Sequence, residues 1–76
     1  MREWRELSAG RLLAIRREVL RETEDALERD LLCNAEVLAE SVWEDGERVY
    51  PDGAAVLAAL SCREMEELLR ELGIAE

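Results

Sequence analysis

The stretch LERDLLCNAEVLAESV, residues 27–42, decides the fold. Its apolar series is Leu27, Leu31, Ala35, Leu38 and Val42. Spacing by threes and fours places these side chains on one face of an α-helix, with glutamates on the other faces. The stretch therefore predicts a helix of about five turns. We expect Thr23 to cap its start, with Glu24 and Asp25 in the first turn facing the exposed N–H groups.

A shorter apolar series precedes this stretch. Its members are Leu12, Leu13, Ile15, Val19 and Leu20. Ser8, with Leu7 before it, fits an N-cap, which predicts a helix over residues 9–21. Since no Gly or Pro separates the two series, one continuous helix over residues 9–43 is the alternative. We favour a break within residues 22–25, because a break lets the two apolar faces meet inside one chain.

The middle of the chain predicts a change of backbone direction. The run EDGE at residues 44–47 predicts the end of the long helix, because Gly46 readily adopts the left-handed conformation found past helix ends. An extended elbow should follow at residues 48–50, since Val49 and Tyr50 favour strands and Pro51 disfavours helix at the preceding residue. This elbow is too short to form a sheet alone.

Two shorter helices are expected after the elbow. Asp52 fits the cap of a short apolar helix over residues 54–60. The run SCRE at residues 61–64 fits a capping box, so a last helix should begin there and continue to about Leu72. Gly73 and Ile74 should close it, with Ile74 near Leu69.

Together these patterns predict an all-α fold and a single domain over residues 1–76. We expect a small bundle of two long and two short helices with a short extended elbow between them. The chain is 76 residues long and 49% hydrophobic, with only three aromatic residues. So small a core typically supplies a few kcal/mol, about 3–5, which favours self-association through apolar helix faces.

Charge excludes one class of partner. Nineteen acidic residues and ten basic ones, all Arg, give a net charge of −9, which disfavours nucleic acid. Residues 1–21 carry six Arg and three Glu, whereas residues 22–76 carry four Arg and sixteen acids. A basic head on an acidic body suits head-to-tail or partner contacts, and an uneven solvated surface is the simpler interpretation.

The chain lacks the residue patterns of common enzymes. It has no His, no phosphate-binding loop, and two cysteines, Cys33 and Cys62, without metal-site spacing. We interpret both as reduced thiols, and Glu36 and Glu40 as solvated surface acids rather than metal ligands. We therefore predict no catalytic residue, metal or cofactor. Because no signal peptide or membrane-spanning run is present, the host cytoplasm is the expected location.

Four residues are the candidates for contact with a protein partner: Trp4, Trp43, Val49 and Tyr50. Trp4 either meets a partner or folds back, whereas Trp43 fits core or edge packing. Val49 and Tyr50 on the elbow either pack beneath it or face a partner. Asn34, beside the apolar stripe, is expected to anchor the loop after Trp43.

One resemblance is carried by the run NAEVLAES at residues 34–41, by DGERVY at 45–50, by DGAAVL at 52–57, and by Leu60-Ser61. This order of helix, acidic Gly turn, elbow, short helix and Ser-capped helix resembles the small tail assembly chaperones of long-tailed bacteriophages and prophages. The resemblance covers about half of the chain. It implies an all-helical, self-associating, non-enzymatic protein that binds the tape measure protein and keeps it soluble. The sequence does not show whether a longer frameshifted form exists.

Two other functions fit the composition. An acidic inhibitor that mimics DNA would use the net charge of −9, although the basic head speaks against it. A helical dimeric regulatory adaptor is the other alternative. The sequence alone does not identify the partner or the oligomeric state.

Overall fold

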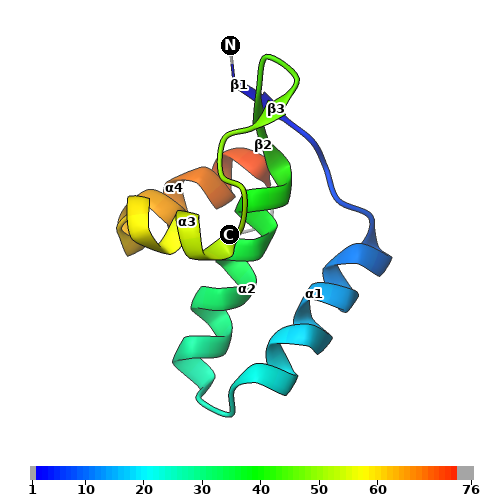
Figure 1. Ribbon diagram of the computed structural model, residues 1–76, viewed down its shortest axis with the longest axis vertical. Coiled ribbons are helices and arrows are strands. Elements are labelled where there is room, and N and C mark those ends of the chain that lie inside the picture. The colour runs from blue at the N-terminus through cyan, green and yellow to red at the C-terminus, as the bar shows by residue number, and fades with distance from the viewer. Residues whose placement is uncertain (1, 74–76) are drawn as a thin grey trace.

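The computed structural model describes residues 2–73, which form four helices beside a small sheet (Figure 1). The helices are α1 (Ala9–Glu22), α2 (Ala26–Ser41), α3 (Gly53–Ala59) and α4 (Cys62–Leu72). The strands are β1 (Arg2–Trp4), β2 (Val42–Glu44) and β3 (Glu47–Arg48), in the antiparallel order β1-β2-β3. The prediction of two long and two short helices is confirmed, and the sheet is an addition to it.

The chain breaks between α1 and α2, as predicted. The N–H of Thr23 donates to the carbonyl of Val19 and closes α1. The residue that caps α2 is Asp25, whose Oδ1 accepts from the N–H of Glu28 at 2.8 Å. Thr23 as the cap of α2 was therefore wrong, since its hydroxyl accepts from the N–H of Asp25 and shapes the turn.

The end of α2 differs from the prediction. The helix stops at Ser41, and Val42–Glu44 continue as β2 because β3 and β1 offer backbone partners on both sides. Asp45 and Gly46 have φ angles of 52° and 82° and form the turn between β2 and β3. Gly46 thus provides the left-handed backbone of a hairpin turn rather than a helix end.

The first strand has no counterpart among the predicted elements. Arg2 pairs with Glu44 and Trp4 with Val42, and the N–H of Arg5 donates to the carbonyl of Ser41 at 2.8 Å. The beginning of the chain is thereby fixed to the segment that follows α2. Of the predicted elbow, Arg48 lies in β3, and Val49 and Tyr50 follow this strand.

Local capping signals set the two C-terminal helices, as predicted. Asp52 accepts from the N–H of Ala55 at 2.9 Å at the start of α3. Ser61 and Glu64 form the full capping box of α4, with bonds of 3.1 and 2.9 Å. Gly73 closes α4 with a φ of 84°. The predicted contact of Ile74 lies outside the described residues.

The core is built around α2. Buried apolar side chains come from all four helices and from β2: Ile15, Val19, Ala35, Val37, Leu38, Ala39, Val42, Val56, Met65, Leu68 and Leu69. Figure 1 shows α1 on one side of α2, with α3 and α4 on the other. None of the described helices combines the length and apolar character needed to cross a bilayer.

Candidate functional site

The sheet assigns the predicted partner residues to its two faces. Trp4 lies opposite Val42, which is fully buried, so this pair faces the core. Trp43 is the next residue of β2 and therefore lies on the outer face. The N–H of Val49 donates to the carbonyl of Val42 at 3.1 Å, and its side chain packs against the core. Of the two alternatives for Trp4, the structure has it folded back.

On the outer face, Trp43 is partly covered by two arginines. The guanidinium carbon of Arg5 lies 3.7 Å from the ring centroid, and that of Arg48 lies 5.8 Å away. The indole N–H donates to the carbonyl of Glu40 at 2.8 Å. Trp43 thus packs at the edge of the fold in cation–π contacts. Edge packing is one of the two positions, core or edge, that the sequence predicted for it.

Tyr50 is half-buried against the core and borders an open hollow, which we call the Tyr50 hollow. Its lining residues come from the first strand, the elbow, the segment before α4 and α4 itself: Arg2, Tyr50, Leu60, Glu64, Glu67, Leu68 and Glu71. Two leucines and the tyrosine ring supply apolar surface, and three carboxylates of α4 supply negative charge. Of the four predicted residues, Tyr50 is thus the one that lines this hollow.

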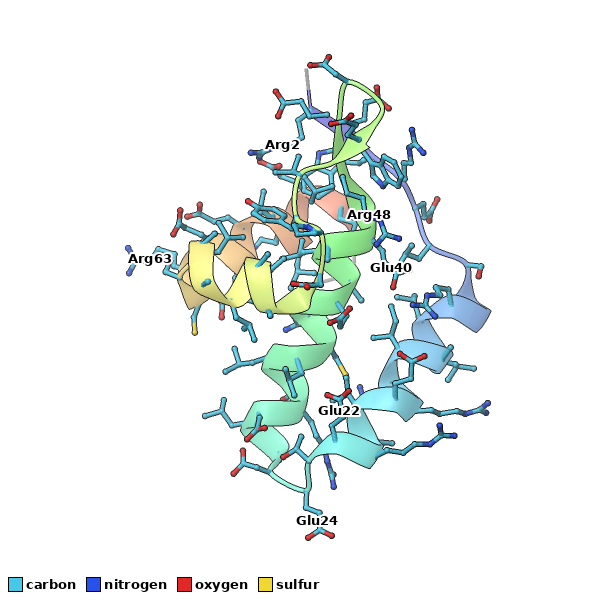
Figure 2. All side chains as sticks on the ribbon, viewed as in Figure 1. Arg2, Glu22, Glu24, Glu40, Arg48 and Arg63 are labelled. Atoms are coloured by element: carbon cyan, nitrogen blue, oxygen red, sulfur yellow. The ribbon has the colours of Figure 1, made fainter. Side chains whose placement is uncertain are left out.

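An ion pair across the long helices was missed by the sequence reasoning. Arg11 donates from Nε and Nη2 to the two carboxylate oxygens of Glu40, at 2.7 and 2.5 Å. The Glu40 side chain is 11% exposed, and Figure 2 shows it directed from α2 toward the start of α1. The hydrogen bond from Arg11 lowers the pKa of Glu40 below its ordinary value.

Glu36 also has a structural role. Its Oε1 accepts from the N–H of Gly53 at 3.1 Å and so fixes the start of α3 to α2. A Cβ at position 53 would collide with this carboxylate, so any other residue there requires the Glu36 side chain to move. The interpretation of Glu36 and Glu40 as solvated acids is therefore wrong for both. Asn34 is half-buried and its side chain makes no hydrogen bond within residues 2–73, so the expectation that it anchors the loop after Trp43 was wrong.

The two cysteines lie in different surroundings. Cys33 on α2 is half-buried, and burial raises the pKa of its thiol. Cys62 is the exposed first residue of α4. Both are free thiols.

Within residues 2–73 no group of three or more His, Cys, Asp or Glu side chains is arranged to hold a metal ion. What the site offers chemically is instead an apolar and acidic recess beside Tyr50 and a cationic, aromatic outer sheet face. Comparisons with family models, with curated proteins and with solved structures gave no match to this chain.

Proposed function

We propose that this protein is a tail assembly chaperone of a long-tailed bacteriophage or prophage. In this role it binds an apolar helical segment of the tape measure protein and keeps it soluble, without catalysing a reaction. The Tyr50 hollow is the observation that carries the proposal, because it joins apolar and acidic surface in one open recess. The order of motifs that resembles this family supports it.

The lining of the Tyr50 hollow suits a helix as the ligand. Tyr50, Leu60 and Leu68 offer apolar surface for the buried face of an amphipathic helix. The row Glu64, Glu67 and Glu71 follows the spacing of one face of α4, and its carboxylates complement Lys or Arg at the edge of such a ligand. The Tyr50 hydroxyl would remain at the wet border.

Tyr50→Ala tests this assignment. Loss of the ring should weaken binding to a helical tape measure segment by more than about 1 kcal/mol, since buried aromatic rings dominate such contacts. Isothermal titration calorimetry at fixed salt measures the change. Leu57→Ala is the matched control, because Leu57 is exposed on α3 and does not line the hollow. Its affinity should match that of the parent protein.

Circular dichroism must show both variants folded. If folded Tyr50→Ala binds as tightly as the parent, Tyr50 is a packing residue and the site assignment fails. If the parent protein itself does not bind tape measure segments, the proposed function is refuted.

The net charge of −9 favours one competing function, mimicry of DNA phosphates toward a DNA-binding enzyme. Such a complex would weaken steeply with added salt, whereas a contact with an apolar helix, whose charge pairs lie only at its edge, would weaken much less. Titration at two salt concentrations against both partners separates the two functions.

A further inference from the structure

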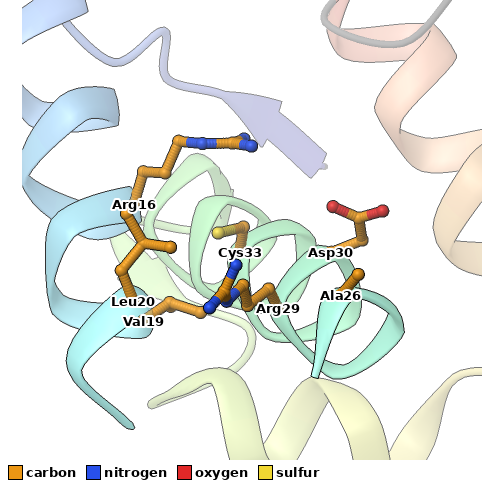
Figure 3. A pocket seen from close by; sticks show the side chains of 7 residues that line it. All are labelled: Arg16, Val19, Leu20, Ala26, Arg29, Asp30 and Cys33. Atoms are coloured by element: carbon orange, nitrogen blue, oxygen red, sulfur yellow. The ribbon is translucent and has the colours of Figure 1, made fainter. Parts of the chain in front are cut away.

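A small hollow, which we call the α1–α2 hollow, lies between the two long helices (Figure 3). Its apolar part is formed by Val19, Leu20, Ala26 and Cys33. Its charges belong to Arg16, Arg29 and Asp30. None of these residues lines the Tyr50 hollow, so the α1–α2 hollow can be considered independently of what binds there.

The apolar part of the α1–α2 hollow has room for a short aliphatic group. Val19 is almost fully buried, whereas Leu20 beside it is 46% exposed and leaves apolar surface uncovered. The volume of the hollow is about 100 Å³. Since an apolar cavity of about 150 Å³ holds a benzene molecule, this hollow fits a branched aliphatic group of about four carbons.

The charged side chains around the hollow have no ion-pair partner within residues 2–73. Nε of Arg29 donates to the carbonyl of Thr23 at 3.0 Å, which holds this side chain beside the hollow. Arg16 on α1 and Asp30 on α2 make no side-chain hydrogen bond in the described part of the chain. Two positive charges and one negative charge are thus left unpaired around one recess.

Arg16 and Asp30 act on the same point of the hollow without touching each other. In Figure 3 the Cys33 thiol lies between their side chains. Burial is the main cause of the raised pKa of this thiol, and Arg16 lowers that pKa whereas Asp30 raises it. Both charges therefore lie near the same sulfur atom. Because they form no ion pair with each other, a small molecule that carries both charges can bridge them.

We propose that the α1–α2 hollow binds a free α-amino acid with a branched aliphatic side chain. Arg16 takes the carboxylate, with Arg29 as a second positive charge, and Asp30 takes the ammonium group. The aliphatic side chain lies against Val19 and Leu20. A simple carboxylate would leave Asp30 unpaired, and a simple amine would leave the arginines unpaired. The bound amino acid joins α1 to α2 across the hollow.

Titration with L-leucine, followed by amide NMR shifts, tests the proposal. A ligand of this size in an open hollow should have a dissociation constant in the roughly millimolar range. Three probes each lack one recognised group: leucinamide lacks the carboxylate, 4-methylpentanoate lacks the ammonium group, and glycine lacks the aliphatic side chain. Each should bind the parent protein at least about tenfold more weakly than leucine does.

Two variants assign the charges of the ligand to their partners. Arg16→Gln should weaken the binding of leucine by about tenfold but should not weaken that of leucinamide, which has no carboxylate for Arg16. Asp30→Asn should weaken the binding of leucine similarly but should not weaken that of 4-methylpentanoate, which has no ammonium group for Asp30. These differences between ligands would not arise from a loss of structure.

Arg17→Gln and Glu28→Gln are the matched controls. They remove the same charges from the same helices at positions that do not line the hollow. Their affinities for leucine should stay within about twofold of the parent value, because solvent and salt screen these charges from the ligand. All four substituted side chains are exposed, and circular dichroism should show the four variants folded.

The position of the NMR shifts gives a second readout. With leucine, the shifted amides should include Leu20 and Cys33 and should exclude Tyr50, since Tyr50 lines a different hollow. No saturable binding of leucine, or shifts centred on Tyr50, would overturn the proposal. Binding of any of the three probes as tight as that of leucine would also overturn it, as would controls that bind as weakly as the test variants.

Discussion

Helices α1 and α4 both pack against α2, but they are covered very differently. The 14 residues of α1 bury Ile15 and Val19, whereas the 11 residues of α4 bury Met65, Leu68 and Leu69. The surplus apolar residues of α1, Leu13 and Leu20, remain about half-exposed. The number of buried side chains in each helix therefore depends on the elements packed against it and not on the length of the helix.

The ends of the two helices differ as well. α4 begins with a reciprocal capping box and ends at the left-handed Gly73. α1 begins with a single side-chain cap, Ser8, and has no acidic residue in its first turn. The ion pair of Arg11 with Glu40 joins α1 to α2 near this end. α1 therefore depends on a few contacts, whose removal would separate it from the rest.

The largest effect should come from the contact of α1 with the core. Ile15→Ala is expected to lower the free energy of unfolding by about 2–5 kcal/mol, because it leaves a cavity at a side chain that is almost fully buried. Leu13→Ala, on the exposed side of the same helix, should change it by less than about 0.5 kcal/mol. Urea unfolding at high dilution compares the two. Equal effects would show that α1 is packed on both sides.

A smaller effect is expected at the helix starts. Ser61→Ala should cost about 1 kcal/mol, because it removes the acceptor for the N–H of Glu64 and breaks up the capping box. Ser8→Ala should cost less, since Ser8 provides one cap bond without a reciprocal partner. Urea unfolding of both variants measures the two losses in unfolding free energy. Ser61→Thr is the control, because threonine keeps a capping hydroxyl. A larger loss of unfolding free energy for Ser8→Ala than for Ser61→Ala would contradict this prediction.

The smallest effect concerns pH. Because the pKa of Glu40 is lowered in the folded state, its ion pair stabilises the fold above the ordinary Glu pKa, and this stabilisation is lost as pH falls through the lowered value. Glu40→Gln should therefore remove part of the acid sensitivity of unfolding. Thermal melts of parent and variant from neutral pH to below about pH 4 follow this difference. Parallel pH profiles would show that the pair contributes nothing.

Local signals predicted the helices well. Ser8, Asp52, Ser61 and Gly73 act at the ends where capping chemistry indicated, because each forms bonds to residues a few positions away. The end of α2 was misplaced because Val42 and Trp43 are compatible with a helix and with a strand, and pairing with distant backbone decided between them. Asp45-Gly46 was the signal that could have shown the hairpin.

The candidate site was predictable only in part. Tyr50 beside a turn was a sound candidate, but the acidic row that shares its hollow belongs to a later helix. Glu40 and Glu36 find their partners 29 and 17 positions away, so periodicity could not distinguish them from solvated glutamates.

The pairing of β1 with β2 sets an order on synthesis. β1 is synthesised before its partner β2, which lies beyond the end of α2, so β1 waits until both long helices have been made. Its closure then encloses the whole helical hairpin as one loop, at an entropic cost that the earlier steps do not carry. The two long helices should form before β1 pairs with β2, and β1 should be among the last elements to fold.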